Sequence, residues 1–232
     1  MTGCLLIHGY TGGPYELEPL VDYLKECTDW NIKVPILPGH GKKLSLENTT
    51  YQSWLHAAEY RFNKLAETCD EVYCIGFSMG GMIAVYLAAK YDIAKLVLLA
   101  PAGKFLCSRQ LSRDFGVLIK DALKGHLKRN HLYLHYKKKM REVPIKANLE
   151  FWKLIRFSRK FLNEVKAPVL IVQGKQDHMV PYKTVYYLDQ EIASKQKEIV
   201  FFDQARHMIC WVDDKNILNE LIHSFLVKPM AC

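Results

Sequence analysis

A serine between two glycines is the strongest chemical feature of the chain. The sequence Gly76-Phe77-Ser78-Met79-Gly80 follows a short apolar run and precedes an apolar stretch that fits a helix. A G-x-S-x-G pattern between a strand and a helix is typical of a nucleophilic serine held on a sharp turn. Such a turn leaves room for very small residues at the two flanking positions, and Gly76 and Gly80 supply them. A plain strand-to-helix turn is the alternative, because so short a pattern also arises by chance.

A nucleophilic serine needs two partners, and the sequence offers both downstream. A base must remove the hydroxyl proton and a carboxylate must orient that base. After such a turn the chain order is serine, then Asp or Glu, then His. Asp177 follows the apolar run 169–173, and His207 follows the run 198–202. Both are therefore expected at the same sheet edge as Ser78, which predicts a catalytic triad of Ser78, Asp177 and His207.

Position decides which of the nine histidines is the base. Apart from His207, those considered lie in glycine loops ahead of the serine, in a basic segment, beside the predicted acid, or within a predicted helix. In chain order they are His8, His40, His126, His131, His135, His178 and His223. His207 follows both the serine and the predicted acid in chain order and lies just past a strand at the same sheet edge, so it is the predicted base.

The acid has fewer competitors. Asp92 ends a predicted helix, and Asp203 ends the strand that precedes the base. Some proteins of this topology carry the acid after the strand that here ends at Ala100, but no carboxylate is present there. This favours Asp177 as the acid. A turn-forming aspartate ahead of Val180-Pro181 is the alternative interpretation.

The attack of a serine on an ester creates a negative oxygen that backbone N–H groups can stabilise. Each such donor is worth about 10²–10³ in rate. The amide of Met79, directly after the serine, is the first expected donor. The second is expected in the loop after the first strand, where the sequence His8-Gly9-Tyr10 favours the amide of Tyr10. His8 itself is expected to brace that loop without taking part in the chemistry.

Strand-like and helix-like segments alternate along the chain and must position these residues. Predicted strands cover residues 4–7, 32–36, 71–75, 95–99, 168–174 and 198–203, and predicted helices cover 17–24, 54–65, 79–91, 182–193 and 217–225. This alternation predicts an α/β fold with helices on both faces of a mostly parallel sheet of about six strands.

The alternation stops between residues 101 and 166, which are mostly helix-compatible. This segment holds 17 Lys and Arg against 5 Asp and Glu, whereas the rest of the chain holds 15 against 19. The interruption follows the carboxyl end of a strand, the edge of a parallel sheet where ligands bind. We therefore expect a hydrolase core of residues 1–100 and 167–232 and a helical cap, or lid, of residues 101–166.

Three interpretations of the cap remain open. In the first, its apolar residues line an acyl pocket while its cations face outward; these residues are Phe105, Leu106, Phe115, Leu118, Ile119, Leu123, Phe151, Trp152 and Ile155. In the second, the cations attract an anionic substrate or a membrane surface. In the third, they form a solvated face. No nucleic-acid-binding motif accompanies the basic residues, so a nucleic-acid partner is not expected.

The remaining composition limits the setting of the protein. The seven cysteines are odd in number, scattered, and include no C-x-x-C pair. This pattern is typical of reduced thiols rather than of disulfides or a zinc site. The first residues show neither the basic region nor the apolar stretch of a signal peptide. No apolar run reaches the ~18 residues of a membrane span. We expect a cytoplasmic protein without metal, cofactor or stable membrane insertion.

Together these motifs resemble the α/β-hydrolase superfamily. The residues that carry the resemblance are Leu6-Ile7-His8-Gly9-Tyr10-Thr11-Gly12, Pro38-Gly39-His40-Gly41, Gly76-Phe77-Ser78-Met79-Gly80-Gly81, Gly174 with Asp177 and Val180-Pro181, and Arg206-His207. Within the superfamily the chain looks most like small bacterial carboxylesterases and monoacylglycerol lipases with a compact helical cap. The chain departs from the usual pattern of these esterases in two ways. It begins close to the strand that leads to the oxyanion loop, whereas members usually have one or two further strands before it. It also carries Arg206 before the base, where many of them have a small residue.

The motifs and the resemblance imply a cofactor-free serine hydrolase. Its expected substrates are small-molecule carboxylic esters with short to medium apolar acyl chains, monoacylglycerols among them. An acyltransferase or a carbon–carbon bond hydrolase could use the same triad. A catalytically silent ligand-binding protein on the same scaffold is a third alternative, since fold does not fix function. The oligomeric state does not follow from the sequence.

Overall fold

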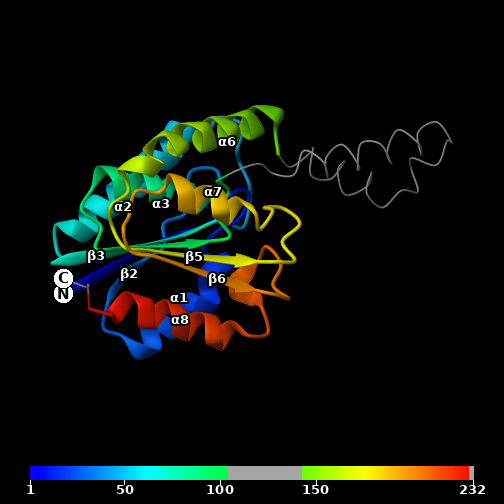
Figure 1. Cartoon of the computed structure of the whole chain (residues 1–232). Helices are drawn as coiled ribbons and strands as arrows, with labels where there is room; N and C mark the ends of the chain where they lie inside the picture. The colour runs from blue at the N-terminus through cyan, green and yellow to red at the C-terminus, as the bar shows by residue number, and fades with distance from the viewer. Residues whose placement is uncertain (104–142, 230–232) are drawn as a thin grey trace.

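A six-stranded parallel sheet forms the centre of the molecule (Figure 1). The computed structural model describes residues 1–103 and 143–229. The strands are β1 (Thr2–Ile7), β2 (Asn31–Lys33), β3 (Glu71–Phe77), β4 (Lys95–Leu99), β5 (Val169–Gly174) and β6 (Lys197–Phe202). They lie in the order β2-β1-β3-β4-β5-β6, and every neighbouring pair is parallel. The predicted parallel sheet of about six strands is confirmed.

The strands read as continuous apolar runs because helices cover both faces of the sheet. Every residue of β4 and β5 is buried. The edge strand β2 is the exception, since it ends at Lys33 and not at Ile36 as the apolar run predicts. Pro35 explains the difference, because a proline has no N–H to donate to a strand ladder and disfavours continuation of the strand.

Two helical layers enclose two separate hydrophobic clusters (Figure 1). One face carries α1 (Glu18–Cys27) and α8 (Lys215–Val227). The opposite face carries α2 (Tyr51–Ala66), α3 (Met79–Lys90), α6 (Ile145–Ser158) and α7 (Thr184–Glu191). Three short 3-10 helices, η1 (Pro14–Leu17), η3 (Arg159–Glu164) and η4 (Ile209–Trp211), complete the described elements.

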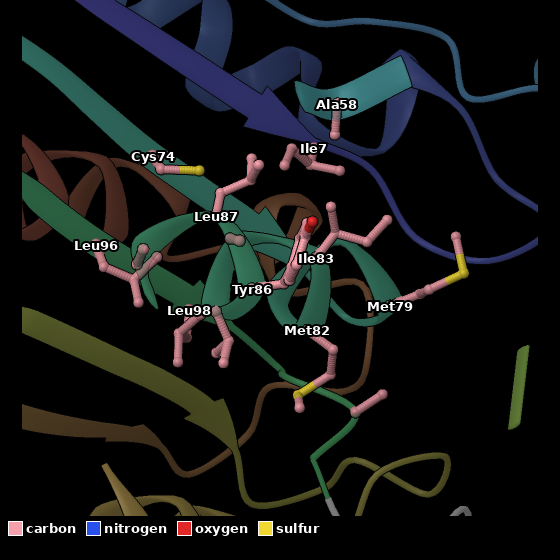
Figure 2. Close-up of a cluster of buried hydrophobic side chains, with 14 of the residues drawn as sticks. Ile7, Ala58, Cys74, Met79, Met82, Ile83, Tyr86, Leu87, Leu96 and Leu98 are labelled. Atoms are coloured by element: carbon pink, nitrogen blue, oxygen red, sulfur yellow. The ribbon is translucent and has the colours of Figure 1, made fainter. Parts of the chain in front are cut away.

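Helix α3 is the most deeply buried helix and begins directly after Ser78 (Figure 2). Its residues from Met79 to Ala88 are all buried. A helix that is apolar on every side requires such an environment. Figure 2 shows its side chains Met82, Ile83 and Leu87 among residues from β1, β3 and β4. The start of α3 is therefore held rigidly at the carboxyl edge of the sheet.

The described part of the predicted cap packs on the core through α6. Phe151 and Ile155 are buried against α2 and α3, as expected of an inner face. Trp152 corrects the prediction, because it is 41% exposed and does not belong to that buried face. Neighbouring residues on a helix point about 100° apart, so Trp152 cannot share the inward direction of Phe151. The other residues expected to line the pocket, Phe105 to Leu123, lie outside the described residues.

A buried glutamate attaches α6 to the core. Glu150 is 5% exposed, and its Oε2 accepts a hydrogen bond from the backbone N–H of Tyr51 at 3.1 Å, in the first turn of α2. Its Oε1 accepts from Lys153 Nζ at 2.7 Å. A carboxylate is stabilised at a helix N-terminus, where free N–H groups and the helix dipole both favour negative charge.

Replacement of this carboxylate should loosen the attachment. We expect Glu150→Ala to lower the free energy of unfolding by about 1–2 kcal/mol, because a buried N–H loses its acceptor. Glu164→Ala, at an exposed glutamate of η3, is the control and should change stability by less than about 0.5 kcal/mol. Urea titration measures both. Equal unfolding midpoints for the two variants would show that Glu150 does not hold α6.

Candidate active site

Ser78 occupies a strained turn between β3 and α3. Its backbone has φ 52° and ψ −113°, a conformation that residues other than glycine rarely adopt. The flanking glycines are required by close approach of the backbone. A Cβ on Gly76 would lie 2.5 Å from the Cα of Gly81, and a Cβ on Gly80 would lie 2.6 Å from the carbonyl oxygen of His8. The turn therefore excludes larger residues on both sides of the serine.

Backbone hydrogen bonds from the end of β4 fix the same turn. The N–H of Ser78 donates to the carbonyl of Leu99 at 2.8 Å. The carbonyl of Ser78 accepts from the N–H groups of Gly81 and Ala102, each at 3.1 Å. Because both backbone groups of Ser78 are satisfied, the strained conformation is held from two sides and the hydroxyl is left to point away from the sheet.

The structure brings Ser78, His207 and Asp177 into one hydrogen-bonded chain. His207 Nε2 lies 3.0 Å from Ser78 Oγ, and His207 Nδ1 lies 2.7 Å from Asp177 Oδ2. The Asp177 side chain is fully buried, and the His207 side chain is 12% exposed. The ring of Phe77 packs 5.1 Å from the ring of His207. An acceptor on one side of the imidazole and a hydroxyl on the other are what a general base requires.

Four donors surround the Asp177 carboxylate. Oδ1 accepts from the backbone N–H groups of Met179 and Val180, both at 2.8 Å, and Oδ2 accepts from Gln173 Nε2 at 2.9 Å as well as facing His207. Asp177 thus makes the backbone hydrogen bonds expected of a turn-forming aspartate, and its carboxylate also contacts His207. Gln173 was not singled out from the sequence, although a glutamine near the end of an otherwise apolar buried strand was an available signal.

The two amides expected to bind the oxyanion lie on segments that touch. Met79 is the first residue of α3, where a helical N–H has no partner within the helix. Tyr10 lies three residues after the end of β1, and Gly80 packs against the backbone of Ile7 and His8 in that segment. Across residues 1–103 and 143–229, neither amide donates a hydrogen bond to another backbone or side-chain group.

Aromatic rings and α6 hold the side chain of Tyr10. Its ring stacks on Phe151 with centroids 4.8 Å apart and packs against His40 and Trp54, each at 5.9 Å. Its hydroxyl donates to Asn148 Oδ1 at 3.1 Å. Burial raises the pKa of Tyr10 well above its usual value, so the phenol stays neutral and acts as a donor. The loop after β1 is therefore attached to α6 at two points.

His8 braces the loop after β1, as expected from the sequence. It is buried, its Nδ1 lies 2.9 Å from the Gly9 carbonyl, and its Nε2 accepts from the Leu37 N–H at 3.0 Å. Nδ1 must therefore carry the ring proton. Burial lowers the pKa of His8 to about 4, so the ring is neutral near pH 7. A neutral ring joins the loop after β1 to the segment before the Pro38 turn.

A second carboxylate, Glu16 of η1, lies under the same loop. It is 8% exposed, and its Oε2 accepts from the N–H of Gly9 at 2.8 Å. Burial raises the pKa of Glu16 to about 7. No Lys or Arg in the described part of the chain forms an ion pair with it. No pattern in the sequence indicated this residue, because a glutamate in the first turn of a helix is ordinary.

The competitors for base and acid lie elsewhere or make other contacts. Asp203 pairs with Lys175 at 2.7 Å and is exposed. His223 lies on α8 and packs against Tyr23 and Trp30, away from Ser78. Arg206 is exposed, and His207 makes its two hydrogen bonds without it. The unusual residue before the base therefore leaves the local hydrogen bonding unchanged.

Two structural observations concern other kinds of site. In the described ranges, no three His, Cys, Asp or Glu side chains are grouped so that they could hold a metal ion. Each helix described in the structure is too short or too polar to cross a membrane.

The parallel sheet, the strained serine turn and the Ser–His–Asp cluster define an α/β-hydrolase architecture. The sequence matches the alpha/beta hydrolase fold family over residues 5–127 and 145–214. Because this match covers most of the chain, the chain belongs to that family.

The relatives are esterases and lipases. The chain is 29% identical to the thermostable monoacylglycerol lipase of Bacillus sp. (strain H-257), across 97% of this chain and 90% of that protein. It is 20% identical to a carboxylesterase of Bacillus subtilis (strain 168), across 97% and 92%. The solved monoacylglycerol lipase of Paleococcus ferrophilus superposes with a TM-score of 0.72 at 21% identity, across 97% and 93%. Within its family the chain is therefore of the esterase and lipase type.

The close approach at Gly80 leads to a prediction about the turn. In Gly80→Ala, the new methyl group would meet the backbone of Ile7 and His8, so α3 and Ser78 must shift. We expect a loss of about 1–3 kcal/mol of stability and at least a tenfold lower kcat/KM for ester hydrolysis. Gly81→Ala is the matched control, since its Cβ would meet nothing nearer than 3.2 Å. Similar activity in the two variants would contradict a requirement for close packing at Gly80.

The donors around Asp177 lead to a second prediction. Gln173→Leu keeps the volume of the side chain but removes one donor from the Asp177 carboxylate, so we expect about a tenfold lower kcat/KM with the fold retained. Gln176→Leu, at an exposed position of the same loop, is the control. Steady-state ester hydrolysis and circular dichroism measure both variants. An unchanged kcat/KM in Gln173→Leu would show that this donor does not matter.

Proposed function

We propose that the protein is a serine hydrolase that cleaves carboxylic esters of short to medium acyl chains, including monoacylglycerols. The observation that carries the proposal is the hydrogen-bonded chain from Ser78 through His207 to Asp177, built on a strained strand-to-helix turn. Relatives named as a monoacylglycerol lipase and a carboxylesterase support the same class of substrate. No step of this chemistry calls for a cofactor.

In the proposed acylation step, His207 Nε2 removes the proton of Ser78 as Oγ attacks the ester carbonyl. The distance of 3.0 Å between these atoms suits direct proton transfer. Asp177 holds the Nδ1–H tautomer of His207 and stabilises the imidazolium that forms. The imidazolium then gives its proton to the leaving alcohol, and the acyl group stays on Ser78.

The amides of Met79 and Tyr10 are the proposed oxyanion donors. Attack by Ser78 converts the carbonyl oxygen into an anion, and donors that are already aligned stabilise it without reorganisation. Water then enters, and His207 removes its proton as the oxygen attacks the acyl carbonyl. The bond to Ser78 Oγ breaks, His207 returns the proton to Oγ, and the acid is released. The hydrogen bond and ring contacts of Tyr10 with Asn148 and Phe151 keep the second donor in place between the two half-reactions.

The described end of the proposed cap favours an apolar acyl group. Phe151 reaches the loop after β1 through its contact with Tyr10, so α6 brings an aromatic side chain close to one proposed oxyanion donor. The cationic side chains Lys146, Lys153 and Arg156 of α6 are exposed. This arrangement supports an apolar inner face, while recruitment of an anionic surface by the outer charges stays a hypothesis.

A chain-length series tests the proposal. We expect the wild type to hydrolyse p-nitrophenyl esters from acetate to palmitate with a maximum at short to medium length, and Ser78→Ala to show no turnover above background. Added alcohols distinguish hydrolysis from acyl transfer, and diketones test for carbon–carbon cleavage. Failure of a fluorophosphonate probe to label the wild type, together with no turnover, would favour a silent binding protein.

The role of the acid gives a further prediction. Asp177→Asn keeps the size of the side chain but removes the charge that favours the productive tautomer of His207, so kcat should fall by about 10³–10⁴ while KM changes little. Asp203→Asn, at an exposed aspartate after β6, is the control and should retain wild-type kinetics. A fall of less than about tenfold in Asp177→Asn would assign the acid to another residue.

A further inference from the structure

Glu16 is a buried carboxylate that the hydrolytic mechanism does not yet use. It lies beneath the loop that carries the proposed oxyanion donor Tyr10 and receives the N–H of Gly9, one peptide before that donor. The carboxylate also packs over Gly12, where a Cβ would fall inside its van der Waals surface. Position 12 therefore requires glycine, because the Glu16 carboxylate fills the space that a side chain there would occupy.

The surroundings of Glu16 contain no compensating cation among the described ion pairs. Burial disfavours its ionised form, whereas the amides of Gly9 and Gly13 and the field of His207 favour it, and the resulting pKa is about 7. A buried, unpaired carboxylate costs stability whenever it is ionised. A neutral side chain at this position would make the folded protein more stable.

The titratable groups that face Glu16 come from three segments. Tyr15 belongs to the same short helix, Cys210 belongs to η4, and His207 precedes η4. Burial raises the pKa of Cys210 to about 12 and also raises the pKa of Tyr15, so both stay neutral between pH 5 and pH 9. Of Glu16, Tyr15 and Cys210, Glu16 is therefore the group whose charge changes in that range.

We propose that Glu16 is a positioning residue for ester hydrolysis, which in its ionised form aligns the loop that carries Tyr10. This inference rests on the proposed function. The carboxylate accepts the Gly9 N–H in a charge-assisted hydrogen bond, which is stronger than one to a neutral acid.

The ionised carboxylate acts on the oxyanion through the backbone. As Ser78 attacks, the substrate oxygen becomes negative, and ionised Glu16 holds the loop of the Tyr10 donor in place for that charge. Protonation of Glu16 removes the charge and leaves a weaker acceptor for the Gly9 N–H. The most active form should thus carry ionised Glu16.

The test is the pH dependence of Glu16→Gln, which resembles the protonated acid in shape and charge. The kcat/KM for a p-nitrophenyl ester, expressed per site titrated with a fluorophosphonate, should be about tenfold lower than in the wild type at pH 8.5. At pH 5.5 the two should agree within about twofold, since Glu16 is then protonated in the wild type. Glu18→Gln, at an exposed neighbour, should follow the wild type throughout.

Stability provides a second readout of the same ionisation. The folded protein binds the Glu16 proton more tightly than the unfolded chain does, so the wild type should lose stability relative to Glu16→Gln as pH rises from about 4.5 to about 7. The Tm of Glu16→Gln should then exceed that of the wild type by about 5 °C at pH 8.5 and match it near pH 4.5. The variant would be more stable and less active at the same pH.

Several results would overturn the proposal. A ratio of wild-type to Glu16→Gln activity that stays constant from pH 5.5 to pH 8.5 would assign Glu16 a purely structural role. An equal Tm for the wild type and Glu16→Gln at pH 8.5 would contradict the ionisation of a buried Glu16 on which the proposal depends. If Ser78 is labelled and esters are cleaved, these results leave the proposed function intact. A wild type that is neither labelled nor active would overturn both proposals.

Discussion

The close approach of three backbone segments is the constraint on which the site depends. The start of α3 crosses the ends of β1 and β3 so tightly that glycine is required at positions 76 and 80. Ser78 then takes a strained conformation that its neighbours in β4 over-determine through hydrogen bonds. The buried helix α3 resists any relaxation of this turn because its apolar surface is enclosed on all sides (Figure 2). Packing energy is thus used to hold one hydroxyl in place.

Buried polar groups complete what the backbone begins. Asp177 keeps its place through four donors, and the neutral His8 ties the loop after β1 to the following segment. Tyr10 connects that loop to α6, so the proposed oxyanion donor and the described part of the cap are coupled by direct contacts. Glu16 differs from these groups because no Lys or Arg of the described residues forms an ion pair with it and because it opposes stability when it is ionised. Groups that cost stability in this way are expected where function requires them.

The sequence predicted the features that are encoded locally. The strands are apolar runs, the serine turn has two obligatory glycines, and the order Ser78, Asp177, His207 follows from strand ends that meet at one sheet edge. The structure places these three side chains in contact, while their catalytic roles stay a prediction. Local patterns were less reliable for short or mixed elements. The strand β2 ends at Lys33, two residues before Pro35, and Trp152 is exposed although its aromatic side chain suits a pocket.

Contacts between distant segments could not be read in the same way. Glu16 reaches Gly9, and Gln173 reaches Asp177 across a turn, through geometry that depends on the whole fold. A single glutamate or glutamine carries no periodicity that would reveal such a partner. The cap shows the same limit, because composition alone does not say which helix face meets the core. The sequence is thus sufficient for the reacting groups and insufficient for the groups that tune them.

Ser78 is the proposed nucleophile, and isolation of its covalent intermediate tests this role. Wild-type protein mixed with a p-nitrophenyl ester and quenched in acid within milliseconds should gain the mass of one acyl group. Peptide mapping should place that group on Ser78, with release of one equivalent of p-nitrophenol in the initial burst. Ester turnover without any acyl-enzyme, or an acyl group on another residue, would contradict the account.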